Sequence, residues 1–163
     1  MIIIKTLIII LTFFFMEFVA WFTHKYIMHG FLWALHKDHH QVDKDKTFQK
    51  NDYFFLIFAI PSIIFFVIGS QDFNYLFFIG VGIALYGLAY FIIHEIIIHR
   101  RLPAPDKTKN RYIIAIRKAH KIHHKNRNKE HGINFGMLIV SRKWVIKRMI
   151  HFFSQINFSP DFS

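Results

Sequence analysis

Ten of the twelve histidines in the chain fall into four short groups. Two groups have the spacing H-x4-H and two have the spacing H-x2-H-H, and the two kinds alternate along the chain. Clustered histidines are typical of metal sites, because a neutral imidazole offers a nitrogen lone pair to a cation. The candidate metal ligands and catalytic residues are His24, His29, His36, His39, His40, His94, His99, His120, His123 and His124.

The two spacings place different demands on a helix. In H-x2-H-H the residues at i, i+3 and i+4 share one helical face, so three imidazoles can converge. In H-x4-H the five residues of an ideal α-helix turn by roughly 500°, which leaves the two side chains about 140° apart. Either the helix ends or bulges between these two histidines, or they bind different metals. The spacing is compatible with both alternatives.

The number and kind of ligands narrow the choice of metal. All-imidazole ligation suits zinc, iron, copper or nickel. Ten ligands exceed the four of a tetrahedral zinc site and fit two metals with positions left for oxygen or water. The chain has no cysteine, which excludes thiolate ligands, iron–sulfur clusters and disulfides. Asp38 and Glu95 lie inside the motifs, where they can orient imidazole N–H groups or simply be solvated. His131 and His151 lie outside the pattern and are expected to be ordinary polar residues.

Long apolar stretches must position these histidines, because 53% of the residues are hydrophobic and they are concentrated in runs. Three runs, at about residues 2–21, 53–69 and 73–94, are long enough to cross a bilayer. The first run has one lysine in its leading region and no small-x-small cleavage site, so we expect a retained span, not a signal peptide. Only a few residues separate the second and third runs, which predicts an antiparallel hairpin.

Basic residues are distributed on one side of this predicted membrane domain. The formal net charge is +11, and 20 of the 21 lysines and arginines fall in residues 24–52 or after residue 99. The positive-inside rule places both segments in the cytoplasm, and all four histidine groups then lie at that one membrane face. Such a distribution indicates a surface that faces anionic membrane lipids, and we expect no nucleic-acid binding.

These observations predict an all-α integral membrane helical bundle. We expect about three to four transmembrane helices, covered on the cytoplasmic side by a histidine-rich helical cap. The length suits a single integral-membrane domain over residues 1–163.

The histidine pattern resembles that of the membrane fatty acid hydroxylase and sterol desaturase superfamily. Within that superfamily, four segments are similar to those of the bacterial β-carotene 3-hydroxylases. They are THKYIMHGFLWALHKDHH, LYGLAYFIIHEIIIHRR, AHKIHHK and GINFGMLIV. The resemblance covers most of residues 18–145. Glu95 stands where the family pattern has Asp, and residues 131–134 replace a more acidic stretch. Because neither departure removes a histidine, both are expected to affect the properties of the metal site or the choice of substrate more than the chemistry.

The resemblance implies a non-haem di-iron monooxygenase of the bacterial inner membrane, with the ten histidines as ligands. It would use O₂ and electrons from a ferredoxin-type donor to hydroxylate C3 of the β-ionone rings of β-carotene. The products would be β-cryptoxanthin and zeaxanthin.

Two other classes of function fit the residues less well. The first is hydroxylation or desaturation of another membrane lipid, a fatty acyl chain or a sterol. The second is a metal transporter or a haem-binding membrane electron carrier. Haem carriers place axial histidines deep within a bundle, whereas these histidines gather at one surface.

Overall fold

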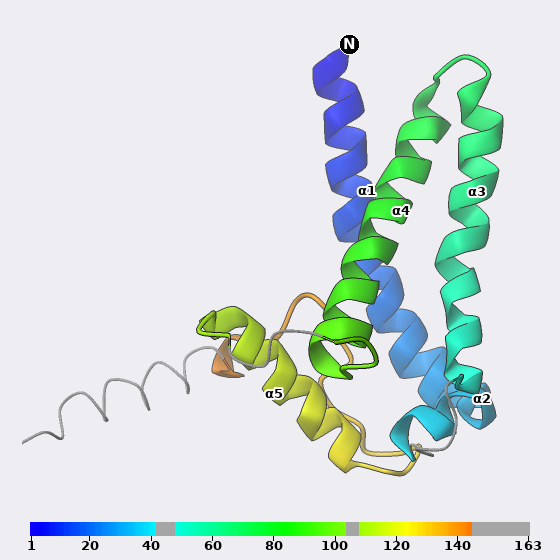
Figure 1. Ribbon diagram of the computed structural model, residues 1–163. Coiled ribbons are helices and arrows are strands. Elements are labelled where there is room, and N and C mark those ends of the chain that lie inside the picture. The colour runs from blue at the N-terminus through cyan, green and yellow to red at the C-terminus, as the bar shows by residue number, and fades with distance from the viewer. Residues whose placement is uncertain (42–47, 104–107, 145–163) are drawn as a thin grey trace, which may run out of the picture.

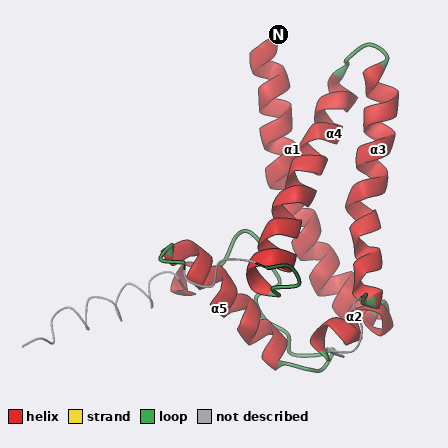
Figure 2. Ribbon diagram, viewed as in Figure 1, coloured by secondary structure: helices red, strands yellow, loops and turns green. Residues whose placement is uncertain are grey.

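The computed structural model describes residues 1–41, 48–103 and 108–144. Within these ranges the chain forms helices joined by loops and turns, with no β-strand (Figure 2). This confirms the predicted all-α fold.

Three continuous helical stretches are long and apolar enough to cross a bilayer, and they cover Ile2–Phe31, Lys50–Ser70 and Tyr75–Ile98. Their α-helical parts are α1 (Ile2–Phe22), α3 (Leu56–Ser70) and α4 (Tyr75–Phe91). Many large apolar side chains on these helices point outward, among them Phe14, Ile63 and Leu88. Apolar surface of this extent is stable in lipid and not in water. The chain is therefore an integral membrane protein, as predicted.

Small residues let the three spanning helices approach closely. The hairpin between α3 and α4 is tight, and the Ser62 hydroxyl donates to the Gly80 carbonyl 3.1 Å away. A Cβ added at Gly82 would lie 2.6 Å from Cβ of Thr12, so α1 and α4 pack there with no room for a side chain. Such contacts replace the hydrophobic effect as the source of helix association in lipid.

Two spans continue past their α-helical parts as π-helices. α1 runs into η1 (Thr23–Phe31), and α4 runs into η3 (Ile92–Ile98). In a π-helix the backbone hydrogen bond joins residue i+5 to residue i, as from the His99 N–H to the His94 carbonyl at 2.9 Å. Side chains five residues apart therefore lie on the same side of the helix. Of the two alternatives for H-x4-H, the bulged helix is confirmed.

The histidine-rich end of the molecule is a cap of short elements below the spans. The backbone breaks at Gly30, after which α2 (Trp33–His40) folds back. A 3₁₀ helix, η2 (Lys50–Phe55), then leads into α3. Helix α5 (Arg111–Lys125) crosses below the lower ends of the spans, opposite the α3–α4 hairpin (Figure 1). These elements confirm the predicted helical cap.

Candidate metal centre

The ten histidines of the sequence pattern gather in two groups. In the first centre, the ligand nitrogens of His24, His29, His36, His40 and His123 all lie within 4.8 Å of one another. The second centre meets the same limit for His39, His99, His120 and His124. His94 belongs to the second centre as well, because its Nε2 lies 3.1 Å from Nε2 of His39. His131 is exposed and in neither group, and His151 lies outside the described residues.

Each kind of histidine motif contributes to the centres in its own way. Both members of an H-x4-H pair lie in the same centre, where they could bind one metal. Each H-x2-H-H group is divided between the centres. In α2, His36 and His40 belong to the first centre and His39 to the second. In α5, His123 belongs to the first centre, and His120 and His124 belong to the second. Helices α2 and α5 therefore hold the two centres side by side.

In the first centre, every imidazole is fixed by a hydrogen-bond acceptor at Nδ1. Four acceptors are backbone carbonyls at 2.8–3.0 Å, and the fifth is the side-chain oxygen of Asn51, 2.6 Å from His36. The carbonyls belong to Asn126, Lys129, Ile133 and Phe135, all after α5. A carbonyl can only accept, so each Nδ1 carries the proton and each Nε2 carries a lone pair.

The Nε2 atoms of the first centre point toward one another. Nε2 of His36 lies 3.2 Å from those of His24 and His40, and Nε2 of His29 lies 3.3 Å from that of His123. Five converging lone pairs with no proton between them repel, unless a cation accepts them. The donor set therefore fits a metal ion.

The second centre is anchored by side chains instead of backbone. His39 Nδ1 lies 2.9 Å from Gln49 Oε1, and His94 Nδ1 lies 2.5 Å from Glu95 Oε1. The Nε2 atoms again face inward, with His120 3.0 Å from His99 and 2.8 Å from His124. Among the described residues, Nδ1 of His120 is buried without a hydrogen-bond partner.

Glu95 connects the second centre to a network of charged residues. Its Oε2 accepts a hydrogen bond from Arg101 at 2.9 Å, and Arg101 also binds both oxygens of Asp52, at 2.7 and 2.8 Å. Asp52 in turn accepts from the backbone N–H of Gln49, the partner of His39. The hydrogen bonds with Asp52 raise the pKa of Arg101. Glu95 thus orients an imidazole, one of the two roles considered for it.

Asp38 does not share that role within the described part of the chain. Its Oδ2 accepts from the backbone N–H of Lys50 at 2.5 Å, and its Oδ1 is buried without a partner there. The orienting side chains beside α2 are Gln49 and Asn51 instead. Of the two roles considered for Asp38, the structure shows neither: its side chain accepts a hydrogen bond at the start of η2.

Burial favours the neutral form of the seven histidines of the centres that lie outside the spans. It lowers the pKa of His40 to about 4, of His99 and His123 to about 3, and of His36 to about 2. The pKa values of His39, His120 and His124 are lowered in the same way. Neutral imidazoles are the form that binds metals, so no proton must leave at neutral pH.

These shifts predict how the metal-free protein responds to pH. An unfolded histidine has a pKa near 6.5, so below about pH 6.5 the unfolded state binds more protons than the folded state. The free energy of unfolding is then highest above that pH. It falls as pH drops toward the folded pKa values, by up to about 1.4 kcal/mol per pH unit for each histidine. Thermal unfolding of metal-free protein in detergent should show Tm falling steeply between about pH 7 and 5. A constant Tm would contradict the buried, neutral clusters.

The sequence analysis did not single out Glu17, a buried carboxylate in α1. Its oxygens accept hydrogen bonds from the backbone N–H groups of Met137, Leu138 and Ile139 at 2.9–3.0 Å, and from the Tyr86 hydroxyl at 2.7 Å. Glu17 therefore ties the segment after α5 to α1 and α4. A lone carboxylate within an apolar run was the signal that could have found it.

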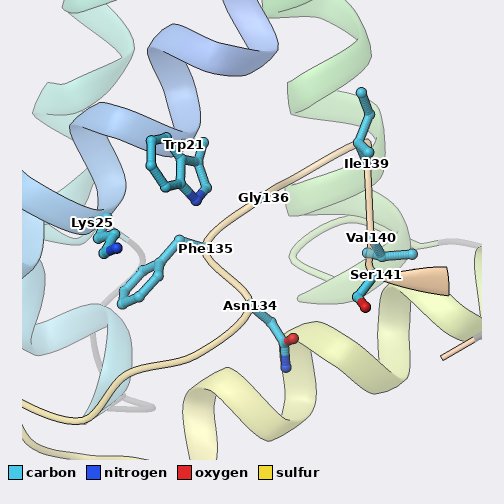
Figure 3. Close-up of a pocket in the computed structure, with 8 residues that line it drawn as sticks. All are labelled: Trp21, Lys25, Asn134, Phe135, Gly136, Ile139, Val140 and Ser141. Atoms are coloured by element: carbon cyan, nitrogen blue, oxygen red, sulfur yellow. The ribbon is translucent and has the colours of Figure 1, made fainter. Parts of the chain in front are cut away.

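A cavity of about 220 Å³ lies beside the first centre, between the lower part of α1 and η1 and the segment after α5 (Figure 3). Trp21 and Lys25 form one wall, and residues 134–136 and 139–141 form the other. The ring of Phe135 also contacts the rings of His24, His29 and His123, with centroids 5.1–5.4 Å apart. One aromatic side chain therefore lines both the cavity and the first centre.

Comparisons with known proteins agree with this architecture. Residues 9–146 match the fatty acid hydroxylase family. A β-carotene hydroxylase of Paracoccus sp. (strain PC1) is 35% identical over 133 residues, covering 81% of this chain and 82% of the relative. The β-carotene hydroxylase of Pantoea ananas is 38% identical over 134 residues, covering 82% and 76%. No solved structure matches the chain. The chain is therefore an oxidoreductase of the fatty acid hydroxylase family, in the group that includes the bacterial β-carotene hydroxylases.

Proposed function

We propose that the protein hydroxylates C3 of the β-ionone rings of β-carotene, giving β-cryptoxanthin and then zeaxanthin. The observation that carries this proposal is the pair of five-histidine centres directly below three membrane spans. The similarity to relatives named for β-carotene hydroxylation supports the choice of substrate. Such a substrate is dissolved in the bilayer, and centres at the membrane boundary can reach it without extraction into water.

The proposed cofactors are two non-haem iron ions, one in each centre, with the ten histidines as ligands. Five imidazoles in each centre would hold an iron ion. Bound iron supplies the redox chemistry that an unactivated C–H bond requires, and zinc has none. The residues of the chain fix the geometry, because acceptors at Nδ1 hold most of the imidazole rings in place.

Hydroxylation of a C–H bond by O₂ also needs reducing equivalents. One oxygen atom enters the C–H bond and the other leaves as water, which consumes two electrons and two protons. A chain without cysteine holds no iron–sulfur cluster of its own. The electrons therefore come from an external donor, which we propose to be of the ferredoxin type.

The substrate ring is proposed to enter the cavity beside the first centre. Trp21 is a residue typical of the membrane–water boundary, so the cavity lies at the depth where the end of a lipid-dissolved molecule would emerge. The ring of Phe135 separates the cavity from His24, His29 and His123 and would shape the approach of the C3 carbon.

The proposed location is the bacterial inner membrane, with both centres facing the cytoplasm. Twenty of 21 basic residues fall, in the sequence, in residues 24–52 or after residue 99, in agreement with the positive-inside rule. We further propose that residues 1–163 act as a single hydroxylase domain, because the histidines of the centres come from η1, α2, η3, the residue after η3, and α5.

The test is product analysis in a host that accumulates β-carotene, with metal content measured on the purified protein. We expect β-cryptoxanthin and zeaxanthin, with about two iron ions per chain. His131→Ala is the matched control, since His131 is exposed and outside both centres, and it should keep full activity. Absence of polar carotenoids from cells with folded, iron-loaded protein would overturn the substrate. A Soret band would show haem and overturn the cofactor.

A further inference from the structure

The outer face of α5 is uniformly cationic. Lys118, Lys121 and Lys125 are exposed at i, i+3 and i+7, and Arg117 is half-buried beside them. The helix contains no acidic residue that could neutralise them. We call these four side chains the α5 basic face. The opposite face of the helix is buried and carries His120 and His123.

The α5 basic face borders an open cavity that reaches the second centre. This cavity has a volume of about 600 Å³, and its lining includes Arg117, Lys118 and Lys121 together with His99, His120 and His124. A molecule bound against the basic face therefore lies next to imidazoles of the second centre. The cavity beside the first centre has Lys25 as its one basic lining residue.

The charge of the centres adds to that of the basic face. All ten proposed ligands are imidazoles and none is an anion, so they leave the charge of a bound metal uncompensated. The carboxylate that contacts a histidine of the second centre is Glu95, and Arg101 binds its other oxygen. This side of the molecule is therefore positive, and it attracts an acidic surface and raises the rate of encounter.

We propose that the α5 basic face docks an acidic, soluble electron-carrier protein, and that electrons enter at the second centre. The inference rests on the proposed function, in which each hydroxylation consumes two electrons from outside the chain. A one-electron carrier would bind and be oxidised twice per turnover. The position of the cavity brings the redox group of a docked carrier near His99, His120 and His124, with no intervening span.

A soluble protein fits this face better than an anionic membrane surface does. Helix α5 slants downward from beside the lower end of α4, and its C-terminal end lies at the end of the molecule opposite the α3–α4 hairpin (Figure 1). A flat bilayer along the lower ends of the spans would not reach this end of the helix. The protruding surface of a soluble protein can reach this end of the helix.

The experiment compares two double charge reversals in the iron-loaded, full-length protein in neutral-lipid nanodiscs. Lys118→Glu with Lys121→Glu reverses the basic face. Arg142→Glu with Lys143→Glu is the matched control, because these exposed residues give the same change in net charge outside the face. Reduction of the iron is followed by its absorption spectrum, without carotenoid. The reductant is either an acidic [2Fe–2S] ferredoxin or a small neutral photoreductant.

We expect reversal of the basic face to slow reduction by the ferredoxin about tenfold or more at low salt, and to remove its dependence on ionic strength. The small reductant should reduce this variant and the control at the same rate. An equal loss in the control, or an equal loss with the small reductant, would overturn the proposal. A variant that is reduced normally in neutral lipid but binds anionic vesicles poorly would show a lipid surface instead. Because no carotenoid is used, the result is independent of the proposed substrate.

Discussion

Replacing His123 or His124 by Ala is expected to abolish hydroxylation, while each change empties a different centre. The two residues are neighbours in α5, yet Nε2 of His123 faces His29 and Nε2 of His124 faces His120. Each variant removes one of the five imidazole nitrogens of its centre and leaves four. Turnover should fall more than about a hundredfold, because a loosened ligand set costs metal affinity as well as geometry.

Metal content distinguishes this expectation from simple misfolding. Purified His123→Ala and His124→Ala should each keep about one iron ion per chain where the parent holds about two. The spectra of the two variants should differ, since the remaining second centre includes the His94–Glu95 pair and the remaining first centre does not. His131→Ala serves as the control and should retain both ions. Full activity in His124→Ala, or loss of both ions in folded variants, would count against two separate centres.

Much of this architecture was predictable because the signals are long or dense. The spans followed from long apolar runs with few charged residues. The gathering of ten histidines at one end of the molecule followed from their two recurring spacings. The irregular helices were also indicated by the sequence. The spacing of His94 and His99 conflicts with an α-helix, and a π-helix resolves that conflict.

The division of ligands between the centres was not predictable. His36, His39 and His40 share a helical face, and the imidazoles separate only because η1 and η3 approach α2 from different directions. The acceptors that fix the first centre are mostly backbone carbonyls, such as those of Ile133 and Phe135. Every residue has such a carbonyl, so the side-chain sequence carries no sign of which ones are used.

The structure gives Glu17 a role that was not predicted from the sequence. We expect its replacement to affect the first centre alone. Three consecutive backbone N–H groups and the Tyr86 hydroxyl converge on its carboxylate. They fix residues 137–139, and the same segment of chain supplies the carbonyls of Ile133 and Phe135 to His123 and His24. Glu17 is therefore a positioning residue for ligands that it does not touch.

Glu17→Gln keeps the size of the side chain but replaces one acceptor oxygen by an N–H₂ donor. The remaining oxygen can still accept from the three backbone N–H groups, but Leu138 loses its second acceptor and the hydrogen bonds become the weaker ones of a neutral amide, at a cost of about 1 kcal/mol. We expect the segment after α5 to loosen, the first centre to lose its metal and the second to keep it. Hydroxylation should fall at least about tenfold, as for the loss of groups that orient ligands in other metal sites.

Two companion variants separate positioning from general stability. Tyr86→Phe removes one hydrogen bond to the same carboxylate and leaves the three backbone contacts, so it should cost about 1 kcal/mol and keep both metals. Glu17→Asp keeps both acceptor oxygens on a shorter side chain and should restore part of the metal content. Iron content and protease sensitivity of residues 133–139 are the measurements. Because this segment supplies the Nδ1 acceptors of His24 and His123 in the first centre, equal loss of both metals in Glu17→Gln would mean that Glu17 only stabilises the fold. Retention of both metals would mean that the segment holds His24 and His123 without it.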